Sequence, residues 1–68
     1  MDKERAGKLI KQRRFFKGMT QSDLAALLNV KQATVALWET GTSFPRPKSL
    51  LKLCDVLDIP VEELLKAG

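Results

Sequence analysis

The sequence contains no histidine and no tyrosine, and its single cysteine is Cys54. A lone cysteine forms no internal disulfide, and without histidine the chain lacks the ordinary ligand set for zinc, so we expect no metal and no cofactor. Acid–base catalysis would depend on scattered Asp, Glu and Lys residues, so we expect no enzyme activity. Cys54 lies in the apolar run SLLKLCDVL, which indicates a small buried core residue.

Long apolar runs are also missing. No segment approaches the roughly 20 apolar residues that a membrane-spanning helix needs, and no signal-peptide core follows Met1. The composition is 44% hydrophobic and 29% charged, with no low-complexity tract. Residues 1–68 are therefore expected to fold as one domain in the cytoplasm, with no contact to a membrane.

Strand signals are absent, because the chain has neither period-two alternation nor a hairpin turn. Helix signals recur and predict an all-α, compact bundle of five short helices. The expected segments are 2–17, 20–29, 31–41, 48–57 and a short helix after Ile59-Pro60 in which Val61, Leu64 and Leu65 turn inward. Thr20 can cap the second helix, and Asn29 can end it in the left-handed conformation.

Two apolar stripes support this division. In the second helix the stripe is Leu24, Ala25, Leu27 and Leu28. In the fourth helix, which Pro47 can open, the apolar residues at i, i+3, i+4 and i+7 are Leu50, Leu53, Cys54 and Leu57.

The charges are unevenly distributed. Residues 1–17 contain seven Lys or Arg against two acidic residues, whereas residues 49–68 contain two basic against four acidic residues. The whole chain carries a formal charge of +4. A basic first part suits a polyanionic partner on one face, although many small domains are this basic.

Residues 20–41 carry the pattern that points to a function, two short helices joined by a tight turn. Val35 and Trp38 mark the inner side of the second of these helices, and its outer side is Gln32, Ala33, Ala36 and Leu37. The major groove of DNA admits one helix and presents donors, acceptors and thymine methyl groups. Gln32 can pair with adenine through two hydrogen bonds, and the three apolar side chains could meet thymine methyls.

Residues spread over most of the chain match a known family. They are Arg14, Met19-Thr20-Gln21, Leu24-Ala25, Leu28, Val30, Gln32, Thr34-Val35, Trp38-Glu39, Gly41, Pro45 and Leu50 to Leu57. Through them the chain resembles the phage-repressor/Cro-like (Xre-type) helix-turn-helix family of DNA-binding domains. The resemblance implies a lambda-repressor-like fold and a homodimeric repressor that binds a pseudo-palindromic site in double-stranded DNA. It also implies a bacterial or phage-encoded protein that is nucleoid-associated when bound.

The resemblance assigns roles to particular residues. It places Gln32, Ala33, Ala36 and Leu37 against the bases, and it pairs Arg14 with Glu39 as a buried ion pair. Phosphate contacts are expected from Gln21, Lys31, Thr40, Thr42 and Ser43. Candidates for the dimer interface are Leu51, Val56, Val61 and Leu65.

Other interpretations remain for several of these residues. Gln21 and Gln32 could be solvated amides, Lys31 a solvated cation, and the two alanines simple helix formers. Lys11, Arg13 and Lys17 are expected to form a solvated cationic face, although the first helix could carry one or two of them toward a phosphate. Three residues depart from the family pattern and favour an alternative, an antitoxin-type module that binds a partner protein and its own promoter: Phe15, Phe16 and Leu37. A further C-terminal domain or partner protein is left open.

Overall fold

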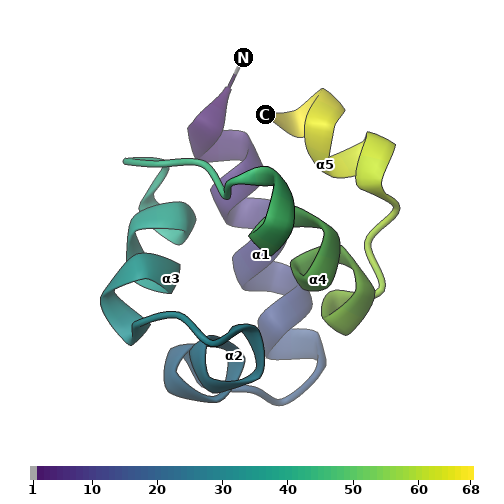
Figure 1. Ribbon diagram of the computed structural model, residues 1–68. Coiled ribbons are helices and arrows are strands. Elements are labelled where there is room, and N and C mark those ends of the chain that lie inside the picture. Colours follow the sequence, from purple (N-terminus) through teal and green to yellow (C-terminus); the bar gives the residue numbers. More distant parts are fainter. Residues whose placement is uncertain (1) are drawn as a thin grey trace.

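The computed structural model describes residues 2–68 and contains five α-helices (Figure 1). They are α1 (Lys3–Phe16), α2 (Gln21–Leu28), α3 (Gln32–Thr40), α4 (Pro47–Leu57) and α5 (Val61–Ala67). The described part of the chain contains no strand, and no helix in it is long and apolar enough to cross a bilayer. The all-α prediction is confirmed, with small shifts of boundary: α1 ends at Phe16 rather than Lys17, and α4 begins at Pro47.

Side-chain caps and left-handed residues set the helix ends, as the sequence predicts. Asp2 Oδ1 accepts a hydrogen bond of 3.0 Å from the backbone N–H of Arg5 at the start of α1. Thr20 caps α2, and the carboxylate of Asp23 accepts a hydrogen bond from the backbone N–H of Thr20, which completes a reciprocal capping box. Asn29 ends α2 in the left-handed conformation, with φ of 55°.

The core lies where the five helices meet. Its most fully buried large side chains are Ile10, Leu24, Val35, Leu53, Leu57 and Leu64. The predicted stripe of α4 is buried along its whole length, and burial raises the pKa of the Cys54 thiol. In α2 the prediction is wrong at Leu27, which is 48% exposed because it lies outside the buried stripe of Leu24, Ala25 and Leu28.

The first helix runs through the middle of the molecule, with α3 on one side and α5 on the other (Figure 1). Its close approach to α3 depends on Gly7, because a Cβ at that position would overlap the backbone carbonyl oxygens of Trp38 and Glu39. The missing side chain lets α1 pack directly on the last turns of α3. Gly7 therefore sets how closely α3 is held against the body of the protein.

Two cations at the end of α1 are bonded within the molecule, which corrects the expectation of a solvated cationic face. Arg13 Nε donates to the backbone carbonyl of Leu57 at 3.1 Å, and Lys17 forms an ion pair with Asp58. Both partners lie at the C-terminal end of α4, where free carbonyls and the helix dipole favour positive charge. Lys11, the third residue of the expected face, is exposed.

The side chains of Phe15 and Phe16 are 63% and 75% exposed. The guanidinium carbon of Arg14 lies 4.6 Å from the centre of the Phe15 ring, and that of Arg13 lies 4.8 Å from the centre of the Phe16 ring. Such cation–π contacts contribute about 0.5–1 kcal/mol at exposed sites. The two rings therefore cover the arginines of their own helix and add little to the core.

Candidate nucleic-acid interface

The four residues expected to face bases share the outward side of α3, which lies at the left edge of the molecule in Figure 1. Ala36 is partly exposed, and the other three are exposed: Gln32, Ala33 and Leu37. The opposite side of the helix is buried through Val35, Trp38 and Glu39. The outward side of α3 therefore presents one amide followed by apolar side chains.

A chain of hydrogen bonds runs from Gln32 into the interior. Gln32 Nε2 donates to Gln21 Oε1 at 2.6 Å, and Gln21 Nε2 donates to Glu39 Oε1 at 3.0 Å. Arg14 donates to both oxygens of Glu39, from Nε at 2.6 Å and from Nη2 at 2.9 Å. Arg14 Nη1 also donates to the backbone carbonyl of Met19 at 2.8 Å. Side chains of α1, α2 and α3 are thereby joined, with Gln32 at the exposed end.

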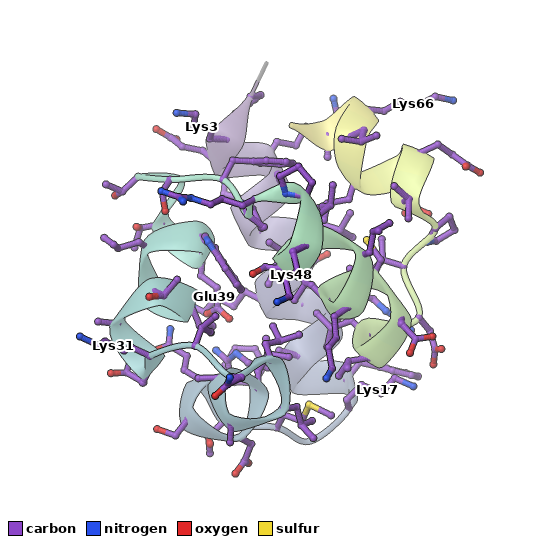
Figure 2. All side chains as sticks on the ribbon, viewed as in Figure 1. Lys3, Lys17, Lys31, Glu39, Lys48 and Lys66 are labelled. Carbon is purple, nitrogen blue, oxygen red and sulfur yellow. The ribbon has the colours of Figure 1, made fainter. Side chains whose placement is uncertain are left out.

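The buried part of this chain is an ion pair between Arg14 and Glu39, which are 5% and 8% exposed. Burial raises the pKa of Glu39, but the hydrogen bonds from Arg14 and Gln21, together with the positive charges of Arg14 and Lys11, outweigh it and hold that pKa below its usual range. The hydrogen bond to Glu39 raises the pKa of Arg14. Both groups are therefore charged at neutral pH, and Glu39 extends from α3 toward the interior (Figure 2). The pair joins α1 to α3 with its hydrogen bonds satisfied, which two buried charges require.

The other residues expected to contact phosphates lie at both ends of α3. Lys31 precedes the helix, makes no side-chain cap and projects away from the body of the protein (Figure 2). The hydroxyl groups of Thr40 and Thr42 lie 2.9 Å apart at the other end. Ser43 follows in the loop and lines a hollow of about 310 Å³ together with Arg46. Ammonium, hydroxyl and guanidinium donors therefore flank the outward side of α3.

Arg46 is a candidate that the sequence pattern did not single out. It is exposed, precedes the first residue of α4 and shares the hollow with Ser43 and Ser49. A guanidinium group can donate two parallel hydrogen bonds to a phosphate, and the start of an eleven-residue helix adds a positive dipole. The sequence could have indicated this residue, because Arg46 is a single cation between Pro45 and Pro47, whose two rings restrict the backbone.

The residues expected at a dimer interface lie on α4 and α5. Leu51 and Leu65 are 61% and 48% exposed, and Val56 and Val61 are partly exposed. The expectation that Leu65 turns inward is therefore wrong, because in α5 the buried side chain is Leu64. Leu51 and Val61 also line one shallow hollow together with Pro60. These apolar side chains are therefore accessible to a second molecule. In residues 2–68 no cluster of His, Cys, Asp or Glu could hold a metal ion.

A family profile described as helix-turn-helix matches residues 10–64, which include all the side chains of the hydrogen-bonded chain. The protein belongs to the helix-turn-helix family. In this helix-turn-helix protein α2 and α3 are the two helices of the motif, and residues 29–31 between them are its turn. The expected helix-turn-helix family is confirmed by this match.

Two solved structures share the fold. The restriction-modification controller protein C.AhdI from Aeromonas hydrophila has a TM-score of 0.83 and 32% identity, over 93% of this chain and 96% of that one. The clp gene regulator ClgR from C. glutamicum has a TM-score of 0.81 over 98% of this chain and 87% of that one, and its 24% identity supports the fold alone.

Curated relatives match a shorter segment. Endothelial differentiation-related factor 1 of Homo sapiens and its homolog in Gallus gallus are each 43% identical to this protein over 47 residues, which is 69% of the present helix-turn-helix chain. The matched segment covers 32% of each of these proteins. The chain therefore spans about a third of their length.

Proposed function

We propose that the protein binds specific sequences in double-stranded DNA as a homodimer and represses transcription, with α3 of each protomer in the major groove. The main support is the hydrogen-bonded chain from Gln32 to Arg14, which holds an exposed amide at the start of an outward-facing helix. The related C.AhdI is described as a controller protein. A repressor role fits a small domain that blocks access to the groove it occupies. Residues 1–68 would act as one DNA-binding unit.

The proposed base contact of Gln32 is with adenine. An amide group has two donor hydrogens and one acceptor oxygen. The hydrogen bond to Gln21 uses one hydrogen, which leaves the other hydrogen and the oxygen for N7 and N6 of adenine. Because Gln21 orients this amide before DNA arrives, less side-chain freedom is lost on binding.

The apolar part of the reading surface is Ala33, Ala36 and Leu37. These side chains can contact thymine methyl groups but cannot exchange hydrogen bonds with base edges. Sequence preference therefore depends on one hydrogen-bonding residue, on methyl contacts and on the shape of the groove. We expect half-sites rich in A·T pairs.

Phosphate contacts would fix the position of the protein on the duplex without reading sequence. The proposed donors are Gln21, Lys31, Thr40, Thr42 and Ser43, together with Arg46. They lie at both ends of α3, so they can meet the backbones on the two sides of one major groove.

Dimerisation would use the apolar side chains of α4 and α5. The proposed contacts are Leu51, Val56, Val61 and Leu65. Helix-turn-helix dimers meet half-sites about 34 Å apart. One protomer measures 26 × 22 × 21 Å, so two protomers side by side can bring their α3 helices to that spacing.

Selection from a random duplex library at two salt concentrations tests the proposal. We expect a pseudo-palindromic site and an affinity that falls with salt, with a log–log slope of about −0.9 per neutralised phosphate. Gln32→Ala should cost about 1–3 kcal/mol at one base pair and relax the preference there. The matched control is Gln12→Ala, an exposed amide on α1. If Gln32→Ala retains the wild-type sequence preference, α3 is not the reading helix.

The exposed Phe15 and Phe16 favour a second candidate function, that of an antitoxin-type module which binds a partner protein as well as its own promoter. Aromatic residues are enriched at protein interfaces. Replacing both with serine should abolish capture of such a partner and leave duplex affinity unchanged. A wild-type protein that captures a partner but shows no salt-sensitive DNA binding would favour this candidate over the first.

A further inference from the structure

A groove between α1 and α5 lies apart from the proposed DNA-binding face. It encloses about 490 Å³, and its walls include Arg5, Lys8 and Leu9 from α1 and Glu63, Lys66 and Ala67 from α5. Because α3 lies on the other side of α1 (Figure 1), a duplex in contact with α3 leaves this groove accessible.

Three cations surround the groove without an ionic partner. Arg5 and Lys8 stand on one wall and Lys66 on the other, and Lys66 extends outward from α5 (Figure 2). Neither of the two ion pairs found among residues 2–68 involves these side chains. Arg5 and Lys8 also belong to the excess of basic residues in positions 1–17. At the other end of α1, Arg13 and Lys17 of the same group are bonded within the molecule. The unused positive charge of α1 is therefore partly gathered at this groove.

The groove also offers apolar surface and one carboxylate. Leu9 and Ala67 are partly buried, and Glu63 is exposed on the α5 wall. A polyphosphate or a second duplex would gain nothing from the apolar surface and would be repelled by Glu63. A peptide segment uses all three features, because its carboxylates can meet the cations, an apolar side chain can cover Leu9, and its backbone N–H groups can donate to Glu63.

We propose that this groove binds an acidic segment of a partner protein that also carries apolar side chains. Ordinary ligand sites enclose about 300–1,000 Å³, so the groove can take a short segment. Leu51 and Val61 of the proposed dimer surface line a different hollow, so that surface stays separate from the groove. The groove therefore lets the protein hold a partner and DNA at the same time, and its role does not depend on DNA reading.

Binding of a labelled peptide to the full chain, followed by fluorescence anisotropy at physiological ionic strength, tests the proposal. The probe is a short peptide of Asp, Glu and Leu, and the matched probe carries Asn and Gln in place of the acids. We expect the acidic probe to bind about tenfold more tightly than the amide probe. The double variant Lys8→Glu/Lys66→Glu should bind the acidic probe at least about tenfold more weakly and change duplex affinity only about threefold or less.

Two further variants separate the groove from the net charge of the protein. Lys3→Glu reverses an exposed cation of α1 that does not line the groove and should leave peptide binding unchanged. Lys8→Gln/Lys66→Gln removes the two charges without reversing them and should have an intermediate effect. Equal weakening by Lys3→Glu, or no binding of the acidic probe by the wild type, would overturn the proposal.

Competition experiments test the other occupants. Displacement of the peptide by duplex DNA would place its site on the DNA-binding face, and equally tight binding of tripolyphosphate would identify a simple anion site. Either result overturns the proposal. A wild type that binds the peptide through Lys8 and Lys66 but binds no duplex would overturn only the proposed DNA-binding function.

Discussion

The Nε2 atom of Gln32 lies 2.6 Å from Oε1 of Gln21, so the first residue of α3 is bonded to the first residue of α2. Gln21 in turn donates to Glu39, whose carboxylate is buried against Arg14. The orientation of the exposed amide therefore depends on groups that also hold the helices together. Mutations of the residues in this series of hydrogen bonds should separate the orientation of the Gln32 amide from the stability of the fold.

A double-mutant cycle between Gln21 and Gln32 should show coupling in sequence preference. Gln21→Ala removes the brace on the Gln32 amide, so each single variant should lose discrimination at the same base pair. The double variant should be little worse than Gln32→Ala, with a coupling energy of about 0.5–3 kcal/mol. The measurement is the ratio of affinities for the selected duplex and a duplex changed at that base pair, which phosphate contacts do not alter. Additive effects of the two substitutions would contradict the brace.

Arg14→Met should strongly destabilise the fold. It leaves the Glu39 carboxylate buried without its cation, which costs about 3–5 kcal/mol. Urea unfolding followed by circular dichroism measures the free energy of unfolding. The double variant Arg14→Met/Glu39→Leu should recover part of the loss, because no unpaired charge then remains. A loss below about 1 kcal/mol in the single variant would show that the pair contributes little to stability.

Stability should decline as the pH falls through the acid range. The pKa of Glu39 is held below its ordinary value of 4.5 in the folded protein, so the unfolded chain takes up a proton first. This contribution is complete above the unfolded pKa and is lost as the pH falls through the folded pKa. The pKa of Asp58, lowered by its hydrogen bond from Lys17, acts in the same direction. Urea unfolding at a series of pH values should show that the free energy of unfolding declines less steeply in Glu39→Gln than in the wild type. Equal declines in the two proteins would show that Glu39 does not cause the loss of stability.

Gly7→Ala should destabilise the protein even though alanine favours helices over glycine by about 0.5–1 kcal/mol. The added Cβ meets the carbonyl oxygens of Trp38 and Glu39, so α1 must move away from α3. We expect a net loss of more than about 1 kcal/mol in urea unfolding. The control is Gln12→Ala on the same helix, which should change stability by less than about 0.5 kcal/mol. A stabilised Gly7→Ala protein would show that this contact is not tight.

Arg46→Ala should weaken binding to all duplexes by a similar factor. A phosphate contact carries no sequence information, so the selected site should stay the same. The slope of log affinity against log salt should become shallower by about 0.9. Titrations of two different duplexes at several salt concentrations measure both quantities. A changed sequence preference with an unchanged slope would instead place Arg46 against the bases.

The helix ends could be predicted because their signals are local. Asp2, Thr20 and Asn29 each act within one turn of their own position, and Pro47 restricts the backbone where α4 starts. The family resemblance pointed to the approach of Arg14 and Glu39, which spacing alone does not reveal. The contacts to bases, phosphates and a second protomer stay predictions.

The remaining features depend on how the helices pack. Arg13 and Lys17 were expected in solvent because nothing in residues 1–17 indicates that the end of α4 lies beside them. Leu27 was expected in the core because the apolar residues of α2 indicate which side of the helix is buried. They do not show how far around the helix the burial extends. Gly7 gives a weak signal, since a glycine inside a helix indicates either close approach or simple tolerance.

The bonds of α1 also bear on the order in which the protein is made. Its partners lie far along the chain: Glu39 is 25 positions from Arg14, and Leu57 is 44 positions from Arg13. Until α4 has left the ribosome and packed, Arg13 and Lys17 have no partner at its end. Contacts this distant in sequence slow folding relative to a bundle held by neighbours alone. The end of α1 is therefore bonded to its distant partners only after α4 has formed.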